Sequence, residues 1–120
     1  MDNTTGAALR VAMDYYRAWT AGDMDAAMRH LADDIVCDAP AGRIEGAAAY
    51  RAFLGPFAGM LRSATLLAAF GDGQTAMIMY DTETALVPSA PGAECLTVVA
   101  GLVTYNRFVF DRAPFLAARQ

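Results

Sequence analysis

The sequence predicts an α+β domain in which helices come first and an antiparallel sheet follows. Apolar residues recur with a period of about 3.6 in the first half of the chain and of about 2 from residue 64 onward. Helices followed by consecutive strands are typical of folds in which the helices cover one face of an antiparallel sheet. Because the chain has 120 residues and 56% of them are apolar, we expect one domain over residues 1–120.

The first helix is expected from about Thr5 to Ala21. Its apolar stripe recurs at helical spacing and comprises Leu9, Ala12, Met13, Tyr15, Tyr16 and Trp19. Gly22 suits the position just after the helix, because glycine tolerates a positive φ. Asp23 should then cap a second short helix, from about Met24 to Leu31, through its side-chain oxygen.

A short strand is predicted over residues 35–38, after a turn at Asp33-Asp34 and before the breaking residues 39–42. A third helix is expected over about residues 46–62. Gly55-Pro56 lies in its middle, and because proline lacks a backbone donor we expect a break or a kink there.

The period of two that follows predicts four further strands, over residues 64–70, 75–87, 94–99 and 102–111. Residues 71–73 should form a hairpin turn, residues 88–92 a loop and residues 100–101 another turn. The tail from Arg112 to Gln120 is expected to fold back onto the domain.

The composition excludes several classes of function. With a net charge of −4, no lysine and no cluster of arginines, nucleic-acid binding is not expected. The single histidine, two separated cysteines and scattered acids lack metal-ligand spacing, so no metal site is expected. The start of the chain has no signal-peptide pattern and no apolar run could span a bilayer, which predicts a cytoplasmic protein without membrane contact. Cys37 and Cys95 are expected to be free thiols.

Four segments carry a resemblance to a known family, namely YYRAWTAGDMDAAMRHLADD, IVCDAPAG, GAAAYRAFL and GLVTYNRFVFDRAPF. In this order they resemble the nuclear transport factor 2-like (NTF2-like) superfamily, in its SnoaL-like and ketosteroid isomerase-like branch. The resemblance implies a cone-shaped sheet wrapped around the helices, with an internal pocket at its open end. Many members are homodimers. The superfamily includes isomerases, cyclases, dehydratases, epoxide hydrolases and non-catalytic binders, so the fold alone does not assign a function.

The resemblance implies roles for two residues. Tyr15 takes the place of the tyrosine that donates to an oxyanion, and Glu94 takes the place of the family's second acid. Because Glu94 shares a strand face with Leu96 and Val98, burial would raise its pKa and allow proton exchange near neutral pH. The alternatives are that Tyr15 is an ordinary core aromatic and that Glu94 is an exposed residue at the start of a strand.

Two aspartates are weaker candidates for the same site. An ungapped match places Ala39 where the family has its base, so Asp38 would face the opposite side of its strand unless a bulge restores it. Asp81 shares one strand face with Met77 and Met79. These three side chains could line the mouth of a cavity, or they could mark where that face meets water.

The first functional hypothesis is a cofactor-free acid/base enzyme that isomerises or cyclises a hydrophobic carbonyl compound. Glu94 would exchange the proton and Tyr15 would donate to the oxyanion, with Asp38 or Asp81 assisting. The residues expected to form the apolar, ligand-binding wall are Trp19, Phe53, Phe57, Met77 and Met79.

The second hypothesis is a binding module without chemistry. The same pocket would hold a hydrophobic small molecule, and the outer face of the sheet would form a two-fold homodimer. The last strand favours such an interface, because neither of its faces is strongly charged.

Overall fold

The structure is a computed structural model, and it describes residues 6–118. Its helices are α1 (Ala7–Thr20), α2 (Met24–Met28), α3 (Ala47–Met60) and α4 (Ala113–Ala118). Its strands are β1 (Leu31–Ala39), β2 (Gly42–Glu45), β3 (Leu61–Gly71), β4 (Thr75–Thr84), β5 (Gly92–Val99) and β6 (Leu102–Phe110). The predicted start of the first helix at Thr5 lies outside the described residues.

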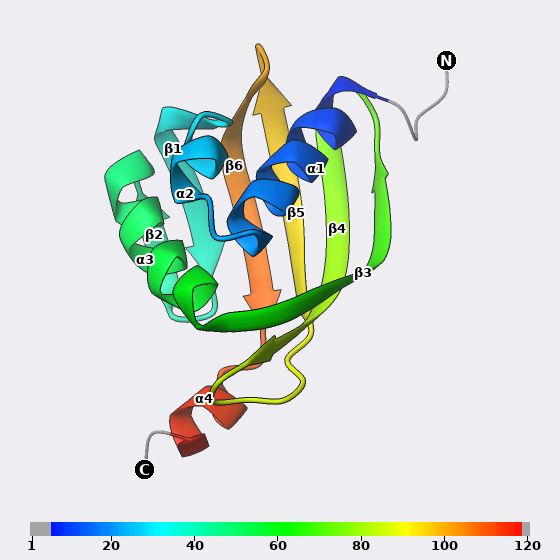
Figure 1. The fold of residues 1–120 in the computed structure, drawn as a ribbon. Helices are drawn as coiled ribbons and strands as arrows, with labels where there is room; N and C mark the ends of the chain where they lie inside the picture. The colour runs from blue at the N-terminus through cyan, green and yellow to red at the C-terminus, as the bar shows by residue number, and fades with distance from the viewer. Residues whose placement is uncertain (1–5, 119–120) are drawn as a thin grey trace.

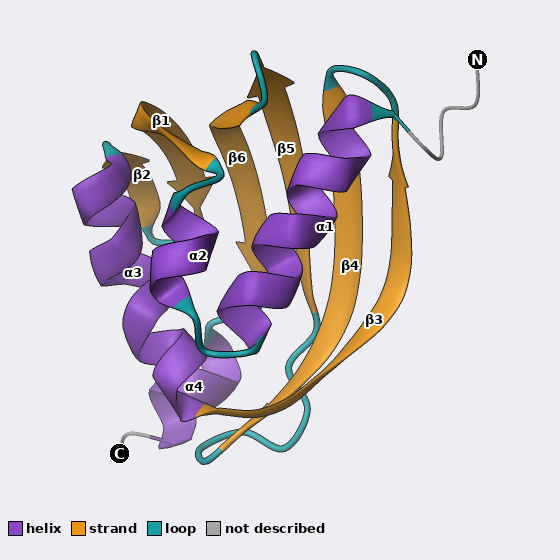
Figure 2. Ribbon diagram, turned by 45° about the horizontal axis from the view of Figure 1, so that its top comes forward, coloured by secondary structure: helices purple, strands orange, loops and turns teal. Residues whose placement is uncertain are grey.

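The strands form one six-stranded sheet in the order β2-β1-β6-β5-β4-β3. All neighbouring pairs are antiparallel except β1 and β6, which are parallel. The sheet is therefore mixed but mostly antiparallel, and the predicted α+β class is confirmed. Figures 1 and 2 show α1, α2 and α3 on the same face of this sheet, with the long β3 bending around them. Two register shifts between β3 and β4 lie along that bend, as is typical of β-bulges.

The link between α1 and α2 agrees with the sequence. Gly22 has a φ of +83°, and the Asp23 carboxylate accepts a hydrogen bond from the Ala26 amide at 3.0 Å. The other end of α1 is fixed against the β3–β4 turn, where the Ala8 amide donates to the Asp72 carbonyl at 3.1 Å. These contacts hold α1 along the inner face of the sheet, which places its buried stripe over the strands.

Three local predictions differ from the structure. Residues Asp33 and Asp34 belong to β1 rather than to a turn, and β1 begins as early as Leu31, which shortens α2. The sequence analysis also missed β2, a four-residue strand that pairs back onto β1. All three differences concern short segments whose secondary structure depends on pairing with a neighbouring strand and not on local periodicity.

Of the predicted break or kink at Pro56, the break is wrong, because α3 continues from Ala47 to Met60. The proline ring crowds the preceding residue as well as the carbonyl one turn back, and Gly55, which has no Cβ, lessens the first of these clashes. Buried side chains flank Pro56 on both sides, with Leu54 at 1% exposure and Ala58 at 6%. Packing of this face against the core stabilises the turn that the missing amide weakens.

The described part of the tail, up to residue 118, folds back onto the domain as predicted, and residues 119–120 lie outside the described residues. The Phe115 ring in α4 lies 6.0 Å from the Phe57 ring of α3 and 6.1 Å from the Phe110 ring of β6. Within residues 6–118, none of the helices combines the length and the apolar character needed to cross a bilayer.

Candidate functional site

A fully buried carboxylate lies at the centre of the inner sheet face. Glu94 on β5 is 0% exposed and accepts three hydrogen bonds. The Tyr15 hydroxyl of α1 and the Asn106 amide nitrogen of β6 donate to Oε1, each at 2.7 Å. The Tyr80 hydroxyl of β4 donates to Oε2 at 2.7 Å. The acid is therefore held from three different elements of the fold.

Tyr50 of α3 completes this cluster. Its hydroxyl oxygen accepts a bond from the Asn106 amide nitrogen at 2.8 Å and is also hydrogen-bonded to the Tyr15 hydroxyl. Because Tyr15 gives its single proton to Glu94, Tyr50 must be the donor to Tyr15. We call these five side chains (Glu94, Tyr15, Tyr50, Tyr80 and Asn106) the Glu94 network.

The register of the strands explains why these side chains meet. Glu94 pairs with Ile78 on one side and Phe108 on the other, so it shares the inner face with both neighbours. Tyr80 lies two residues further along β4, on the same face as Ile78, and is opposite Gly92. A Cβ at Gly92 would lie 3.1 Å from the Tyr80 ring, so glycine leaves room for that ring to cross β5.

The electrostatics of the network favour protonated groups. Burial raises the pKa of the Glu94 carboxyl, and the hydrogen bonds from Tyr15, Tyr80 and Asn106 oppose this only in part. Burial, followed by the nearby Glu94 charge, raises the pKa of Tyr15, Tyr50 and Tyr80 well above 10. The tyrosine hydroxyls are therefore hydrogen-bond donors and not bases, and Glu94 is the acid of the network whose protonated form burial favours.

A cavity of about 350 Å³ lies between α3, α4 and the adjacent ends of the central strands. This volume is at the lower end of the range for small-molecule sites. Most of the lining is aromatic or aliphatic, and it comprises Ala41, Phe53, Leu54, Pro56, Phe57, Met60, Tyr80, Thr82, Ala90, Gly92, Phe108, Phe110, Arg112, Phe115 and Leu116. Tyr80 thus belongs to both the cavity wall and the Glu94 network, and it is the member of the network that reaches the cavity.

The structure brings together several of the predicted site residues. Glu94 and Tyr15 are hydrogen-bonded to each other, and Phe53 and Phe57 both line the cavity. Trp19 is 0% exposed and does not line the cavity itself. Its ring packs behind the wall, 5.9 Å from Phe57 and 5.5 Å from Tyr80. Tyr15 is also outside the lining, so its predicted direct contact with a ligand is replaced by a contact through Glu94 and Tyr80.

Asp38 lies on the opposite face of the sheet. Arg43 donates to its two carboxylate oxygens at 2.9 Å each, and the Tyr105 hydroxyl donates to Oδ2 at 2.7 Å. The Arg43 guanidinium, followed by the Tyr105 hydroxyl, holds the pKa of Asp38 well below its usual range. Asp38 is therefore an ionised acid that is bound to Arg43 and Tyr105, and it takes no part in the Glu94 network.

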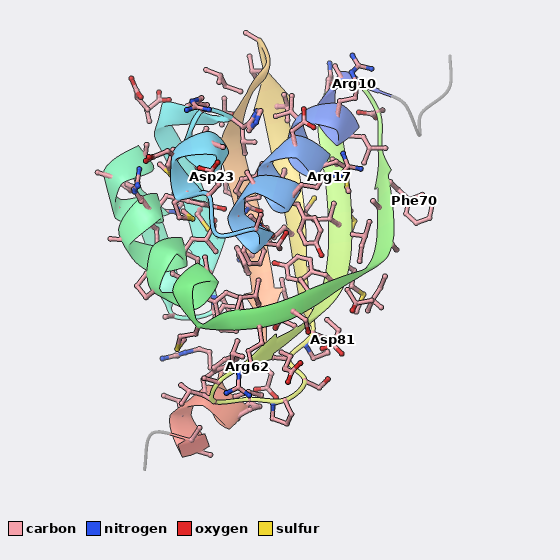
Figure 3. The ribbon with its side chains drawn as sticks, viewed as in Figure 1. Arg10, Arg17, Asp23, Arg62, Phe70 and Asp81 are labelled. Carbon is pink, nitrogen blue, oxygen red and sulfur yellow. The ribbon has the colours of Figure 1, made fainter. Side chains whose placement is uncertain are left out.

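The predicted pocket roles of Asp81, Met77 and Met79 require a correction. The side chains of β4 that face the helices are those of Ile78, Tyr80 and the residues that alternate with them, so these three point outward. Met77 is 55% exposed and Met79 is 46% exposed, and both border a shallow concavity on the outer face. The Asp81 carboxylate accepts bonds from the Ser89 hydroxyl at 3.0 Å. In Figure 3, Phe70 of β3 likewise points away from the helices.

Three members of the network were missed by the sequence analysis, namely Tyr50, Tyr80 and Asn106. Each carried a signal, because Tyr50 shares a helical stripe with Leu54, Tyr80 alternates with Ile78, and Asn106 is an amide within an apolar strand. Such signals are common in ordinary cores, so only the tertiary arrangement distinguishes these residues. Among residues 6–118 no group of three or more His, Cys, Asp or Glu side chains could hold a metal ion.

Comparisons with known proteins agree with this architecture. The family described as the SnoaL-like domain matches residues 12–106. A crystal structure of a protein from Kribbella flavida DSM 17836 has 58% sequence identity and a TM-score of 0.92, covering 94% of this chain and 93% of that chain. No curated protein matches the sequence.

More distant solved structures share the fold alone. A candidate ketosteroid isomerase from Kribbella flavida DSM 17836 is 20% identical with a TM-score of 0.75, covering 88% of this chain and 78% of that chain. A candidate polyketide cyclase from Sinorhizobium meliloti is 18% identical with a TM-score of 0.73, covering 83% and 94% respectively. Others with this fold are described as NTF2-like proteins.

Proposed function

This chain belongs to the SnoaL-like family and has the NTF2-like fold, and we propose that it binds a small, largely apolar carbonyl compound and acts on it by cofactor-free acid/base chemistry. The proposal rests on one observation: Tyr80 lines the apolar cavity and its hydroxyl donates a hydrogen bond to the buried carboxyl of Glu94. Isomerisation and aldol-type cyclisation are the fitting reaction classes. Both pass through an enolate or enol, whose oxygen a buried hydroxyl can stabilise.

The single proton of Tyr80 decides how this site works. In the ligand-free structure that proton points to Oε2 of Glu94. If Glu94 takes up a proton from solvent, its own O–H can donate to the Tyr80 oxygen, and the Tyr80 O–H is then free to donate to the ligand's carbonyl oxygen. The raised pKa of Glu94 makes this protonated state accessible.

In this mechanism Tyr80 is the catalytic residue, because it would touch the substrate. Negative charge that develops on the substrate oxygen draws the Tyr80 proton closer, and the Glu94 proton can follow onto the Tyr80 oxygen. Tyr15 and Asn106 position Glu94 by their hydrogen bonds to Oε1, and Tyr50 is hydrogen-bonded to both of them. The proton on the substrate carbon passes to a solvent water in the cavity, and water returns a proton at the new carbon position. The Tyr80 and Glu94 O–H protons move back as the enol reverts to the ketone, so the network ends each cycle with the protons it had at the start.

The test uses conversion of β,γ-unsaturated ketones such as 3-cyclohexenone into conjugated enones, followed by ultraviolet absorbance. We expect turnover by the wild type and by the control Glu83→Gln, which changes an acid on the outer face. Loss of turnover is expected for Tyr80→Phe and for Glu94→Gln, with binding retained. If 2-acetylnaphthalene and the ketones leave the NMR amide signals of Ala90 and Gly92 unshifted, the cavity does not bind such compounds and the proposal fails.

A second candidate function is binding without chemistry. The observation that favours it is the lining itself, which contains no carboxylate that could remove a proton from carbon. Asp38, the acid closest in sequence to the expected base, is engaged with Arg43 on the other face. Binding of the ketones with no enone formation by the wild type would select this candidate.

We also propose that two copies pair through the outer face of the sheet. Large apolar side chains on this face are strongly exposed, namely Phe70 (65%), Met77 (55%), Val99 (58%) and Val109 (55%). An exposed apolar area of this kind is typical of an interaction surface, and most soluble homo-oligomers are two-fold dimers.

A further inference from the structure

Arg112 is the charged residue in the cavity lining. It lies in the two-residue link between β6 and α4, directly before the first residue of α4, and two residues of α4, Phe115 and Leu116, line the cavity with it. No ion pair or side-chain hydrogen bond of its guanidinium is present within residues 6–118. The carboxylate of its neighbour Asp111 is engaged, since it accepts a bond from the Ala113 amide at 2.9 Å. Arg112 is thus available for an external anion.

The lining has two further polar side chains, Tyr80 and Thr82, and the Thr82 hydroxyl donates to the Ala90 carbonyl. Tyr80 is the one that belongs to the Glu94 network. Its hydroxyl points back to Glu94, which pairs with Phe108. From Phe108 the chain passes Phe110, which lines the cavity, and reaches Arg112 four residues further on. An extended chain rises about 3.3 Å per residue, so the backbone of Arg112 lies at most roughly 13 Å from that of Phe108. Between them the wall is aromatic.

From this arrangement we propose that the ligand is an amphipathic monoanion. Its apolar ring body occupies the aromatic part of the cavity, its carbonyl oxygen meets Tyr80, and a carboxylate at its far end pairs with Arg112. The inference rests on the proposed function and names the substrate class of the same site. A carboxylate is the fitting anion, because the planar guanidinium matches two carboxylate oxygens at once.

The net charge of the protein lets the contribution of Arg112 to anion binding be tested separately from a general attraction. The net charge is −4, so a general electrostatic attraction for anions is not expected. Any preference for a carboxylate over its neutral ester must therefore come from a local cation. Arg112 is exposed, which limits the strength of the pair and makes it sensitive to salt.

The experiment compares three probes that share one ring system, namely 6-acetyl-2-naphthoic acid, its methyl ester and 2-acetylnaphthalene. Dissociation constants are measured by calorimetry for the wild type, for Arg112→Gln and for the control Arg29→Gln, which removes a positive charge from the end of α2. NMR spectra of each variant verify the fold.

We expect the wild type to bind the acid roughly 3- to 20-fold more tightly than the ester, a range that suits an exposed ion pair. Arg112→Gln should remove this preference without changing the affinity for the ester, whereas Arg29→Gln should keep it. Raising the ionic strength from about 0.05 M to about 0.5 M should weaken binding of the acid alone.

The outcomes separate this inference from the proposed function. If acid and ester bind equally, or if Arg112→Gln leaves the preference unchanged, the carboxylate assignment is wrong while the carbonyl site stands. If none of the three probes binds, the proposed function fails and the substrate class fails with it.

Discussion

The hydroxyl of Tyr80 donates to Oε2 of Glu94 across 2.7 Å, and the same tyrosine forms part of the cavity wall. A carboxylate that is 0% exposed is thereby connected to a space large enough for a small molecule. Proton exchange at Glu94 can influence a ligand only through this tyrosine or through a movement of the wall. The predictions below follow from this relationship and from the separation of the two sheet faces.

The first prediction concerns stability and pH. The pKa of Glu94 is raised from its usual value of 4.5, so the folded chain binds this proton more tightly than the unfolded chain. The free energy of unfolding should therefore fall as pH rises from about 4.5 through the raised pKa of the folded state. Glu94→Gln should lack this decrease, and Glu83→Gln should retain it. Urea titrations at several pH values measure the difference, and parallel curves for wild type and Glu94→Gln would contradict the prediction.

The second prediction concerns the Tyr80 hydroxyl as a structural partner. Tyr80→Phe removes one donor from a buried carboxylate, and an unsatisfied buried group of this kind costs about 1–3 kcal/mol. We expect that loss of unfolding free energy at pH values above the raised pKa of Glu94, where the group is ionised, and a smaller loss below it, where Glu94 is protonated. Tyr16→Phe is the control, because the ring is similarly buried and no hydrogen bond of its hydroxyl contributes to the network. Equal losses for both variants would rule out a special role for Tyr80.

The third prediction links ligand binding to pH. A neutral ketone that accepts the Tyr80 proton requires a protonated Glu94, so binding takes up a proton. Affinity for 2-acetylnaphthalene should increase as pH falls through the raised pKa of Glu94, by at most about tenfold per pH unit. In Glu94→Gln the affinity should not depend on pH. Calorimetry in two buffers of different ionisation enthalpy counts the protons, and zero uptake by the wild type would refute the linkage.

The fourth prediction distinguishes the two free cysteines. Burial, followed by the charge of Glu94, raises the pKa of the Cys37 thiol to about 12, so its reactive thiolate is scarce at neutral pH. Cys95 lies on the outer face and is partly exposed. Ellman's reagent should therefore label Cys95 and leave Cys37 unmodified in the folded protein. Cys95→Ser should abolish the fast reaction, whereas equal labelling of both thiols would show that the core opens readily.

The fifth prediction tests pairing through the outer sheet face. Light scattering after size exclusion should give the mass of two chains for the wild type at micromolar concentration. Met77→Glu places a charge in the middle of the apolar face and should yield monomers. Leu86→Glu is the control, because Leu86 is similarly exposed but lies between β4 and β5. A monomeric wild type would contradict the dimer.

Much of the architecture could be predicted because its signals are local. Helical and strand periods identified α1, α3 and the four strands of the second half of the chain, and Gly22 and Asp23 were recognised by their local chemistry. Alternation also placed Glu94 on one strand face with Leu96 and Val98, all of which are buried. Periodicity could not show that α3 continues through Pro56, because that depends on packing of both halves of the helix against the core.

What only the tertiary structure decided is which strand faces turn inward and which distant side chains meet there. Alternation placed Met77, Met79 and Asp81 on one face, but among residues 6–118 no helix covers that face. The Glu94 network joins residues as far apart in the chain as Tyr15 and Glu94, separated by 79 positions. Sequence periodicity by itself determined which residues share a face, because side-chain direction is a local property of the backbone. Burial and the resulting pKa of Glu94 depend on which surfaces pack together, and packing is a property of the whole fold.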